Sequence, residues 1–151
     1  MLDLPAMILT PAAAPFRTQL RVRYADTDAA GVVYYANYLT YFEVARVDLL
    51  RFLGLPINDV QERGVVLPVI EARCTYRRPA RLDDLLEVFV FPAELANARF
   101  SFTYEVRRGD EVLATGMTRH AVVDIASGRP MALPDWLRKL FELVPPAEHR
   151  A

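Results

Sequence analysis

Cysteine and histidine are scarce in this chain, and each scarcity excludes a class of structure. The single cysteine, Cys74, cannot form an internal disulfide, and such cysteine usage is typical of a cytoplasmic protein. Cys74 lies among strand-forming residues, so we expect it to be a small buried hydrophobic side chain. The two histidines, His120 and His149, have no carboxylate or thiol at ligand spacing. The sequence therefore predicts no zinc site.

An excess of charge and long hydrophobic runs are also missing. The chain has 18 basic and 19 acidic residues and a formal net charge of −1, unlike a protein with a basic surface for nucleic acid or membranes. No apolar run is long enough to cross a bilayer. We therefore expect neither nucleic acid nor a membrane among its partners.

The length of 151 residues, of which 53% are hydrophobic, is typical of one globular domain with its own core. Residues 1–16 contain three prolines and lack the basic start of a signal peptide, so we expect a flexible leader. The remainder is expected to form a single domain over residues 17–144 and a short tail over residues 145–151.

Hydrophobic periodicity predicts a strand followed by a long helix. Residues 18–24 alternate between polar and apolar side chains, with Leu20, Val22 and Tyr24 on one side, which is typical of a half-buried strand. Asn37 is a suitable N-cap for the next segment, in which apolar residues recur every three or four positions. We expect an amphipathic helix of about four turns there, ended by a glycine and a proline.

After the helix the sequence is typical of strands joined by short links. Residues 65–76, 85–91, 99–107 and 112–125 are predicted strands, and residues 135–143 form a short closing helix. One long helix against a five-stranded, mostly antiparallel sheet is an α+β design. A sheet with a free edge strand also favours pairing with a second copy of the chain.

Two carboxylates stand where the first strand should end. If the alternation continued, Asp26 and Asp28 would share the apolar side, which is costly unless each has a partner. For Asp26 we favour a polar turn in which the carboxylate caps backbone N–H groups. A magnesium ion held by the pair is a less favoured alternative. For Asp28 we favour a functional role, because Gly31 permits a turn and free N–H groups near residues 34–37 would follow it.

A carboxylate beside free backbone N–H groups suits acyl transfer. The carboxylate attacks a carbonyl carbon or activates water, and the N–H groups hold the oxyanion of the tetrahedral species. No serine or histidine is needed when the leaving group is a good one, as in a thioester.

The run "RYADTDAAGVVYYANYLTYFEVAR" resembles the signature of the 4-hydroxybenzoyl-CoA thioesterase group of the hotdog superfamily. The later segments "YRRPARLDDLLEV" and "SGRPMALP" resemble that family's passage between two strands and its closing turn. The resemblance extends over residues 16–143. It implies a hotdog fold, in which a five-stranded sheet wraps around one long central helix, and homodimers or homotetramers with active sites at the subunit interface. It also implies hydrolysis of an acyl-CoA thioester to free acid and CoA, with no cofactor because coenzyme A is part of the substrate.

The resemblance assigns roles by position. It makes Asp28 the nucleophile or general base, and it places the backbone N–H of Tyr35 in the oxyanion hole. Many acyl-CoA thioesterases of the group have histidine where Tyr35 stands, so the tyrosine favours an aromatic acyl group. The basic cluster that contacts the CoA nucleotide in the aromatic-acyl branch is reduced here to Arg99. The other residues expected to contact substrate are Gly31, Val32, Tyr34, Asn37 and, as a phosphate ligand, Arg129.

Other residues and other functions compete with this interpretation. Glu43 could be a helix glutamate of the kind used by other hotdog thioesterases, but an ion pair with Arg46 is favoured. Arg77 and Arg78 are expected to be solvated, and His120 to be a surface or hydrogen-bonded strand residue. A hotdog hydratase or dehydratase would need a histidine close to the aspartate. The remaining alternative is a hotdog protein that binds acyl-CoA without cleaving it.

Overall fold

The computed structural model describes residues 15–147. Most of the expected leader, the end of the tail and His149 therefore lie outside the described residues. Within residues 15–147, no helix combines the length and the apolar character needed to span a membrane.

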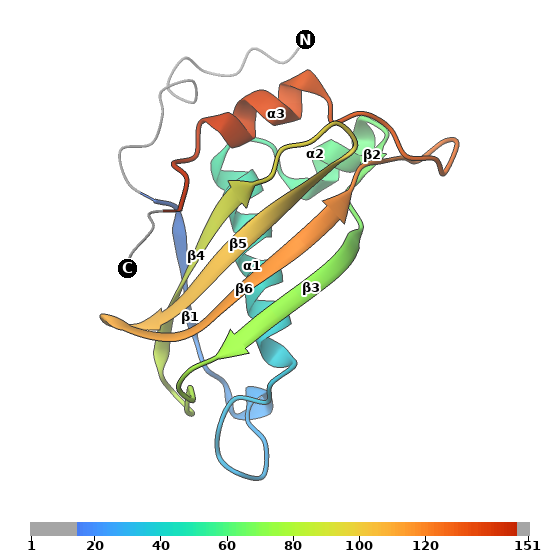
Figure 1. The fold of residues 1–151 in the computed structure, drawn as a ribbon. Coiled ribbons are helices and arrows are strands. Elements are labelled where there is room, and N and C mark those ends of the chain that lie inside the picture. Colours follow the sequence, from blue (N-terminus) through green and yellow to red (C-terminus); the bar gives the residue numbers. More distant parts are fainter. Residues whose placement is uncertain (1–14, 148–151) are drawn as a thin grey trace.

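Five strands form the main sheet, in the order β1-β4-β5-β6-β3 (Figure 1). They are β1 (Arg17–Arg21), β3 (Val69–Tyr76), β4 (Leu85–Ala93), β5 (Arg99–Arg108) and β6 (Glu111–Ala121). All four neighbouring pairs are antiparallel, so the expected "mostly antiparallel" sheet is wholly so. Strands β1 and β3 are the two edges, which leaves β3 without a neighbour on its outer side in the described chain.

The long helix α1 (Asn37–Phe52) lies against one face of this sheet (Figure 1). Its apolar stripe is buried, and Phe42 stacks on Tyr104 of β5 with ring centroids 4.3 Å apart. Gly116 on β6 permits this approach, because a Cβ atom there would lie 2.3 Å from the Phe42 ring. The α+β prediction of one helix packed on a five-stranded sheet is therefore confirmed.

The first strand is shorter than predicted. It ends at Arg21, and Tyr24–Asp26 forms a 3-10 turn (η2). Tyr24 is 82% exposed, so its expected place on the apolar side with Val22 is wrong. The carboxylate of Asp26 accepts a hydrogen bond from the Arg23 N–H and thereby stabilises a turn in place of strand pairing.

The two longest predicted strands each break in two. Val65–Val66 (β2) and Val123–Asp124 (β7) pair with each other as a separate two-stranded sheet. Pro68 lies between β2 and β3, because proline has no N–H to donate to a neighbouring strand. A short helix, α2 (Ile57–Glu62), follows Pro56 and was not predicted.

The closing helix α3 (Asp135–Glu142) is confirmed to within a residue, and it covers the end of the sheet far from the loop before α1 (Figure 1). The structure also corrects the prediction that Cys74 is buried. Its side chain packs against the core but is only partly buried, because β3 is an edge strand.

A series of hydrogen-bonded side chains crosses the core beneath α3. The Nδ1 atom of His120 lies 2.8 Å from the carbonyl oxygen of Leu67, so Nδ1 carries the proton. Nε2 is then an acceptor for the Thr118 hydroxyl at 2.8 Å, and Thr118 in turn accepts from the Tyr104 hydroxyl at 2.6 Å. His120 is 2% exposed. It is thus a satisfied core histidine, one of the two roles expected from the sequence.

This burial predicts a pH-dependent stability. Burial lowers the pKa of His120 to about 4, although the bond to Leu67 opposes the shift. The unfolded chain therefore binds the proton first as pH falls below about 6.5, and the free energy of unfolding should drop by roughly 2 kcal/mol between pH 7 and pH 5. Denaturant unfolding at both pH values measures this drop. His120→Gln cannot titrate and should show a much smaller drop; an equal drop in both proteins would contradict the assignment.

Candidate active site

Asp26 holds the loop between β1 and α1 together. Its carboxylate is 5% exposed and accepts hydrogen bonds from the N–H and the guanidinium of Arg23, each at 3.0 Å, and from the Tyr41 hydroxyl at 3.0 Å. Its backbone carbonyl accepts from the Tyr34 N–H at 2.9 Å and from the Asn37 side-chain amide at 2.8 Å. One residue therefore joins the 3-10 turn, the end of the loop and α1.

These contacts settle two sequence predictions. Asp26 caps a backbone N–H within a turn, as favoured, and it does so from a buried position. Asn37 is the first residue of α1 and not its N-cap, and its amide bonds the Asp26 carbonyl instead. Burial alone would raise the pKa of Asp26, but the bonds from Arg23 and Tyr41 outweigh it and keep that pKa below its usual range.

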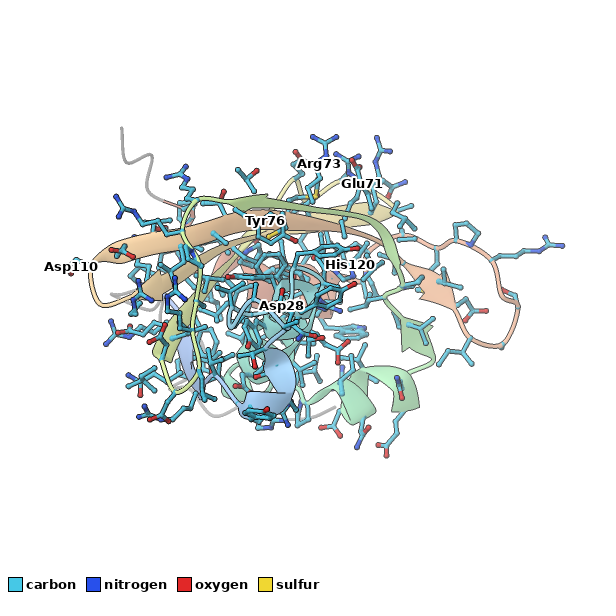
Figure 2. The ribbon with its side chains drawn as sticks, turned by 90° about the horizontal axis from the view of Figure 1, so that it is seen from below. Asp28, Glu71, Arg73, Tyr76, Asp110 and His120 are labelled. Atoms are coloured by element: carbon cyan, nitrogen blue, oxygen red, sulfur yellow. The ribbon has the colours of Figure 1, made fainter. Side chains whose placement is uncertain are left out.

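Asp28 lies in a tight turn beyond Asp26. Its N–H donates to Val32 at 2.9 Å, its carbonyl accepts from the Gly31 N–H at 3.0 Å, and Gly31 adopts a φ of +79°. Such a φ is one that glycine tolerates far better than other residues, as the sequence predicted. The carboxylate of Asp28 is exposed, and its Oδ1 accepts from the Ala30 N–H at 2.8 Å. Within residues 15–147 no donor bonds its Oδ2, so this oxygen is free to accept a further bond. Figure 2 shows Asp28 on the loop at this end of the molecule.

Free N–H groups follow the turn. Whereas the Tyr34 N–H donates to Asp26, the N–H groups of Tyr35 and Ala36 bond no acceptor in the described part of the chain. The side chains of Tyr34 and Tyr35 are 45% and 62% exposed, so solvent and ligands can reach this segment. A short segment thus carries unused backbone donors of the kind that can stabilise an oxyanion, and a carboxylate of the kind that can act as nucleophile or base.

A hollow of about 240 Å³ adjoins the Tyr35 segment. It is lined by Val32, Val33, Tyr35, Tyr38, Tyr76, Arg77, Arg78 and Pro79. Tyr38 and Tyr41 are only 3% and 4% exposed, so the tyrosines of this region divide into core residues of α1 and exposed residues of the loop. Val32 also pairs with Arg81 in an isolated bridge, which ties the loop to the segment before β4.

Tyr76 is the residue of this region that the sequence did not single out. Its hydroxyl donates to the Tyr35 carbonyl at 2.7 Å, a contact between residues 41 positions apart. Its ring meets that of Tyr38 edge to face, with centroids 5.1 Å apart. Nothing local in "RCTYRR" distinguishes it from an ordinary strand tyrosine, and only the pairing of β3 beside α1 brings it to the loop.

Arg99 and Arg129 lie far from this loop within one chain. Tyr76 pairs with Ala114 on β6, whereas Arg99 pairs with Ala121. The seven-residue separation on β6 spans about 23 Å. Arg129 follows β7, and its carbonyl accepts from the Asp124 N–H, three residues beyond the Ala121 that pairs with Arg99. The single chain therefore does not bring the two arginines together with Asp28.

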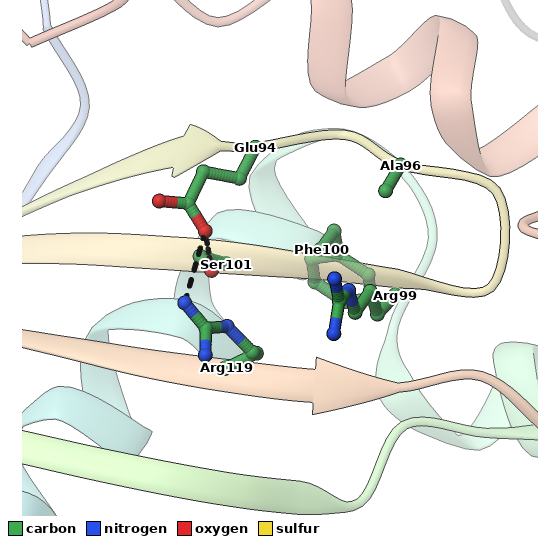
Figure 3. Close-up of a pocket in the computed structure, with 6 residues that line it drawn as sticks. All are labelled: Glu94, Ala96, Arg99, Phe100, Ser101 and Arg119. Atoms are coloured by element: carbon green, nitrogen blue, oxygen red, sulfur yellow. Dashed lines mark hydrogen bonds and ion pairs between the residues drawn. The ribbon is translucent and has the colours of Figure 1, made fainter.

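Arg99 borders a second pocket, of about 170 Å³ (Figure 3). There the Glu94 carboxylate accepts from the Ser101 hydroxyl at 3.0 Å and pairs with Arg119 at 3.4 Å. Arg119 also pairs with Glu71 on β3. Arg99 has no ion pair within residues 15–147, so its charge is free to meet an anion.

The helix glutamate pairs as favoured. Glu43 lies 3.6 Å from Arg46, and the Glu43 side chain is 65% exposed. The described residues also contain no group of three or more His, Cys, Asp or Glu side chains placed to bind one metal ion. Asp26 and Asp28 have separate sets of hydrogen-bond partners.

Asp26→Asn should damage both the fold and the loop. An amide cannot accept from both Arg23 and Tyr41 without placing its own N–H₂ group against a donor, so we expect a loss of about 2 kcal/mol in the free energy of unfolding. Denaturant unfolding measures the loss, with Glu142→Gln on the exposed face of α3 as the matched control. A loss no larger than that of the control would contradict the role of Asp26.

Known proteins resemble this chain in sequence and in fold. A profile described as the thioesterase-like superfamily matches residues 22–141. The chain is 35% identical over 127 residues to the acyl-CoA thioesterase YbgC of Haemophilus influenzae, with 83% of this chain and 93% of the relative covered. It is 33% identical over 130 residues to the 1,4-dihydroxy-2-naphthoyl-CoA hydrolase of Thermosynechococcus vestitus, with 82% and 89% covered.

A solved structure extends the comparison to the fold. The hypothetical protein TT1821 of Thermus thermophilus superposes with a TM-score of 0.80 at 39% identity, covering 85% of this chain and 98% of that one. The matched region contains the whole loop from Arg23 to Asn37, α1 and the main sheet after β1. The chain thus belongs to the thioesterase-like superfamily and has its hotdog fold.

Proposed function

We propose that this protein is an acyl-CoA thioesterase, which hydrolyses an acyl-CoA thioester to the free acid and CoA. The observation that carries the proposal is that one short loop contains both an exposed carboxylate, that of Asp28, and an unused N–H, that of Tyr35. Tyr35 also lines a largely apolar hollow. The names of the Haemophilus and Thermosynechococcus relatives, an acyl-CoA thioesterase and an acyl-CoA hydrolase, support the same reaction.

The chemistry needs few groups. The thioester carbonyl oxygen accepts from the Tyr35 N–H, and negative charge develops on that oxygen as the carbon becomes tetrahedral. Asp28 either attacks the carbonyl carbon to form an anhydride that water then opens, or takes a proton from the attacking water. In both routes the C–S bond breaks and the CoA thiolate leaves.

Aromatic acyl groups fit the lining of the hollow. The exposed rings of Tyr35 and Tyr76 offer surface to an acyl group whose carbonyl lies at the Tyr35 N–H. The Thermosynechococcus relative is named for an aromatic acyl-CoA, and the resemblance to the 4-hydroxybenzoyl-CoA group has the same implication. The substrate class we propose is therefore an aromatic acyl-CoA, with CoA as part of the substrate.

Two copies would complete the site. β3 is an edge strand with Val69 43% and Ile70 55% exposed, which favours pairing with the same strand of a second copy. Antiparallel pairing would place the Arg99 end of one copy beside the Asp28 end of the other. We propose such a homodimer, alone or within a homotetramer, in which Arg99 and Arg129 of one copy contact the phosphates of a CoA bound at the Asp28 loop of the other.

A hydratase function fits the structure less well. The only histidine within residues 15–147, His120, is buried with both ring nitrogens bonded, and it lies in the core chain of Tyr104 and Thr118. A hydratase of this fold would need its histidine beside Asp28. A binding protein without activity is the outcome that a negative hydrolysis assay would favour.

Asp28→Asn tests the proposed reaction. The amide neither attacks a carbonyl nor accepts a proton, so kcat should fall by roughly 100-fold or more while folding is retained. Thiol release measures this on benzoyl-, 4-hydroxybenzoyl-, 1,4-dihydroxy-2-naphthoyl-, phenylacetyl- and short-chain acyl-CoA. Asp110→Asn, in the exposed turn between β5 and β6, is the matched control. The role of Asp28 is wrong if its variant keeps most of the wild-type rate.

Arg99→Gln tests the site across the interface. Loss of a phosphate contact should raise KM for a CoA ester by roughly 10-fold with little change in kcat. The N-acetylcysteamine thioester of the same acid lacks the nucleotide, so its hydrolysis should be unaffected. An unchanged KM for the CoA ester would contradict the proposed phosphate contact.

A further inference from the structure

Tyr35 and Ala36, the Tyr35 segment, lie between residues that are held by backbone hydrogen bonds, but a separate contact holds Tyr35 itself. The Tyr34 N–H donates to the Asp26 carbonyl at 2.9 Å, and the Tyr34 carbonyl accepts from the Asn37 N–H at 2.9 Å. Tyr35 lies between these bonded residues, and its own N–H has no acceptor in the described part of the chain. In those residues the one hydrogen bond to the Tyr35 backbone is the bond from Tyr76 to its carbonyl, at 2.7 Å.

That bond reaches the loop from the sheet. Tyr76 is the last residue of β3, and its backbone pairs with Ala114 of β6. Its ring packs edge to face on Tyr38 at an interplanar angle of 82°. The hydroxyl is therefore held by the sheet and by α1, whereas its acceptor belongs to the loop. Figure 2 shows Tyr76 on the sheet and Asp28 on the loop, seen from the end of the molecule where the loop lies.

The hydroxyl remains a donor throughout the range in which such an enzyme works. Burial, together with the neighbouring Cys74, raises the pKa of Tyr76 to about 12. A carbonyl can only accept, so the direction of the bond from Tyr76 to Tyr35 is fixed.

The bond from Tyr76 affects the direction of the unbonded N–H groups through the geometry of the peptide units. The Tyr35 carbonyl and the Ala36 N–H share one planar trans peptide unit, so holding the oxygen also orients that N–H in the opposite direction. The Tyr35 N–H belongs to the preceding peptide unit, whose Tyr34 carbonyl already accepts from the Asn37 N–H. The bond from Tyr76 therefore acts on the Tyr35 N–H indirectly, by limiting rotation about the Tyr35 φ and ψ angles that join the two units. A donor on the carbonyl oxygen also polarises the peptide unit and strengthens its N–H as a donor.

We propose that Tyr76 is a positioning residue for the oxyanion hole, which holds the Tyr35 segment so that its free N–H groups face the thioester carbonyl oxygen. The proposal rests on the thioesterase function proposed above. It assigns β3 a part in catalysis in addition to its place at the edge of the sheet. Because an oxyanion forms only in the transition state, the hydroxyl should affect turnover more than substrate binding.

Tyr76→Phe tests this with the loss of one hydroxyl. With an aromatic acyl-CoA that the wild type cleaves, kcat and kcat/KM should both fall by roughly 10-fold while KM stays within about twofold. Tyr24→Phe is the matched control, because Tyr24 belongs to the same loop, is 82% exposed and should keep full activity. Thermal unfolding of the three proteins fixes an assay temperature well below every midpoint, so that loss of fold cannot imitate the effect.

The possible outcomes are distinct. A kcat for Tyr76→Phe equal to that of Tyr24→Phe would overturn the proposal, and so would a loss that comes entirely from a raised KM, since Tyr76 would then be only a wall of the hollow. Lower NMR order parameters for the Tyr35 and Ala36 backbone amides of Tyr76→Phe would accompany the predicted loss of kcat. If the wild type itself cleaves no acyl-CoA, the thioesterase function fails instead, whereas unchanged order parameters at these two amides of Tyr76→Phe would overturn the positioning role independently of activity.

Discussion

The buried carboxylate and carbonyl of Asp26 are the constraint on which the site depends. A carboxylate that is almost fully buried is tolerated only with several donors, and Asp26 has Arg23 and Tyr41. Its carbonyl meanwhile holds Tyr34 and Asn37. In the described chain, the Asp28 carboxylate and the N–H groups of Tyr35 and Ala36 keep unused polar atoms in this loop. The first acid of the pair organises the loop, and the second is left free for chemistry.

Close packing of α1 on the sheet determines where that loop can lie. Gly116 has no side chain, so Phe42 can stack on Tyr104 and α1 lies close to β5 and β6. The start of α1 is then beside the end of β3, where Tyr76 reaches the Tyr35 carbonyl. The loop from Arg23 to Asn37 is thus held from three directions, by the turn after β1, by α1 and by the sheet.

Much of this could be predicted from the sequence. The alternation in β5, the helical spacing in α1 and the motif from Asp26 to Asn37 each specify a local structure, and the structure has all three elements. The exact end of β1 could not be predicted, because Asp26 stabilises a 3-10 turn through a local bond that competes with strand pairing. Tyr76 could not be predicted as part of the site, because its contact with Tyr35 is made only in the folded chain. Arg99 was predicted as part of the site, although a single chain separates it from Asp28 by most of the length of β6.

The central claim is that a thioester carbonyl lies between the Asp28 carboxylate and the Tyr35 N–H. A crystal structure with a non-hydrolysable aromatic acyl-CoA analogue, in which a methylene group separates the carbonyl from sulfur, tests it most directly. We expect the analogue's carbonyl oxygen to accept from the Tyr35 N–H at about 3 Å, with a carboxylate oxygen of Asp28 near the carbonyl carbon. A carbonyl bound away from this loop, or an Asp28 carboxylate turned away from it, would contradict the account.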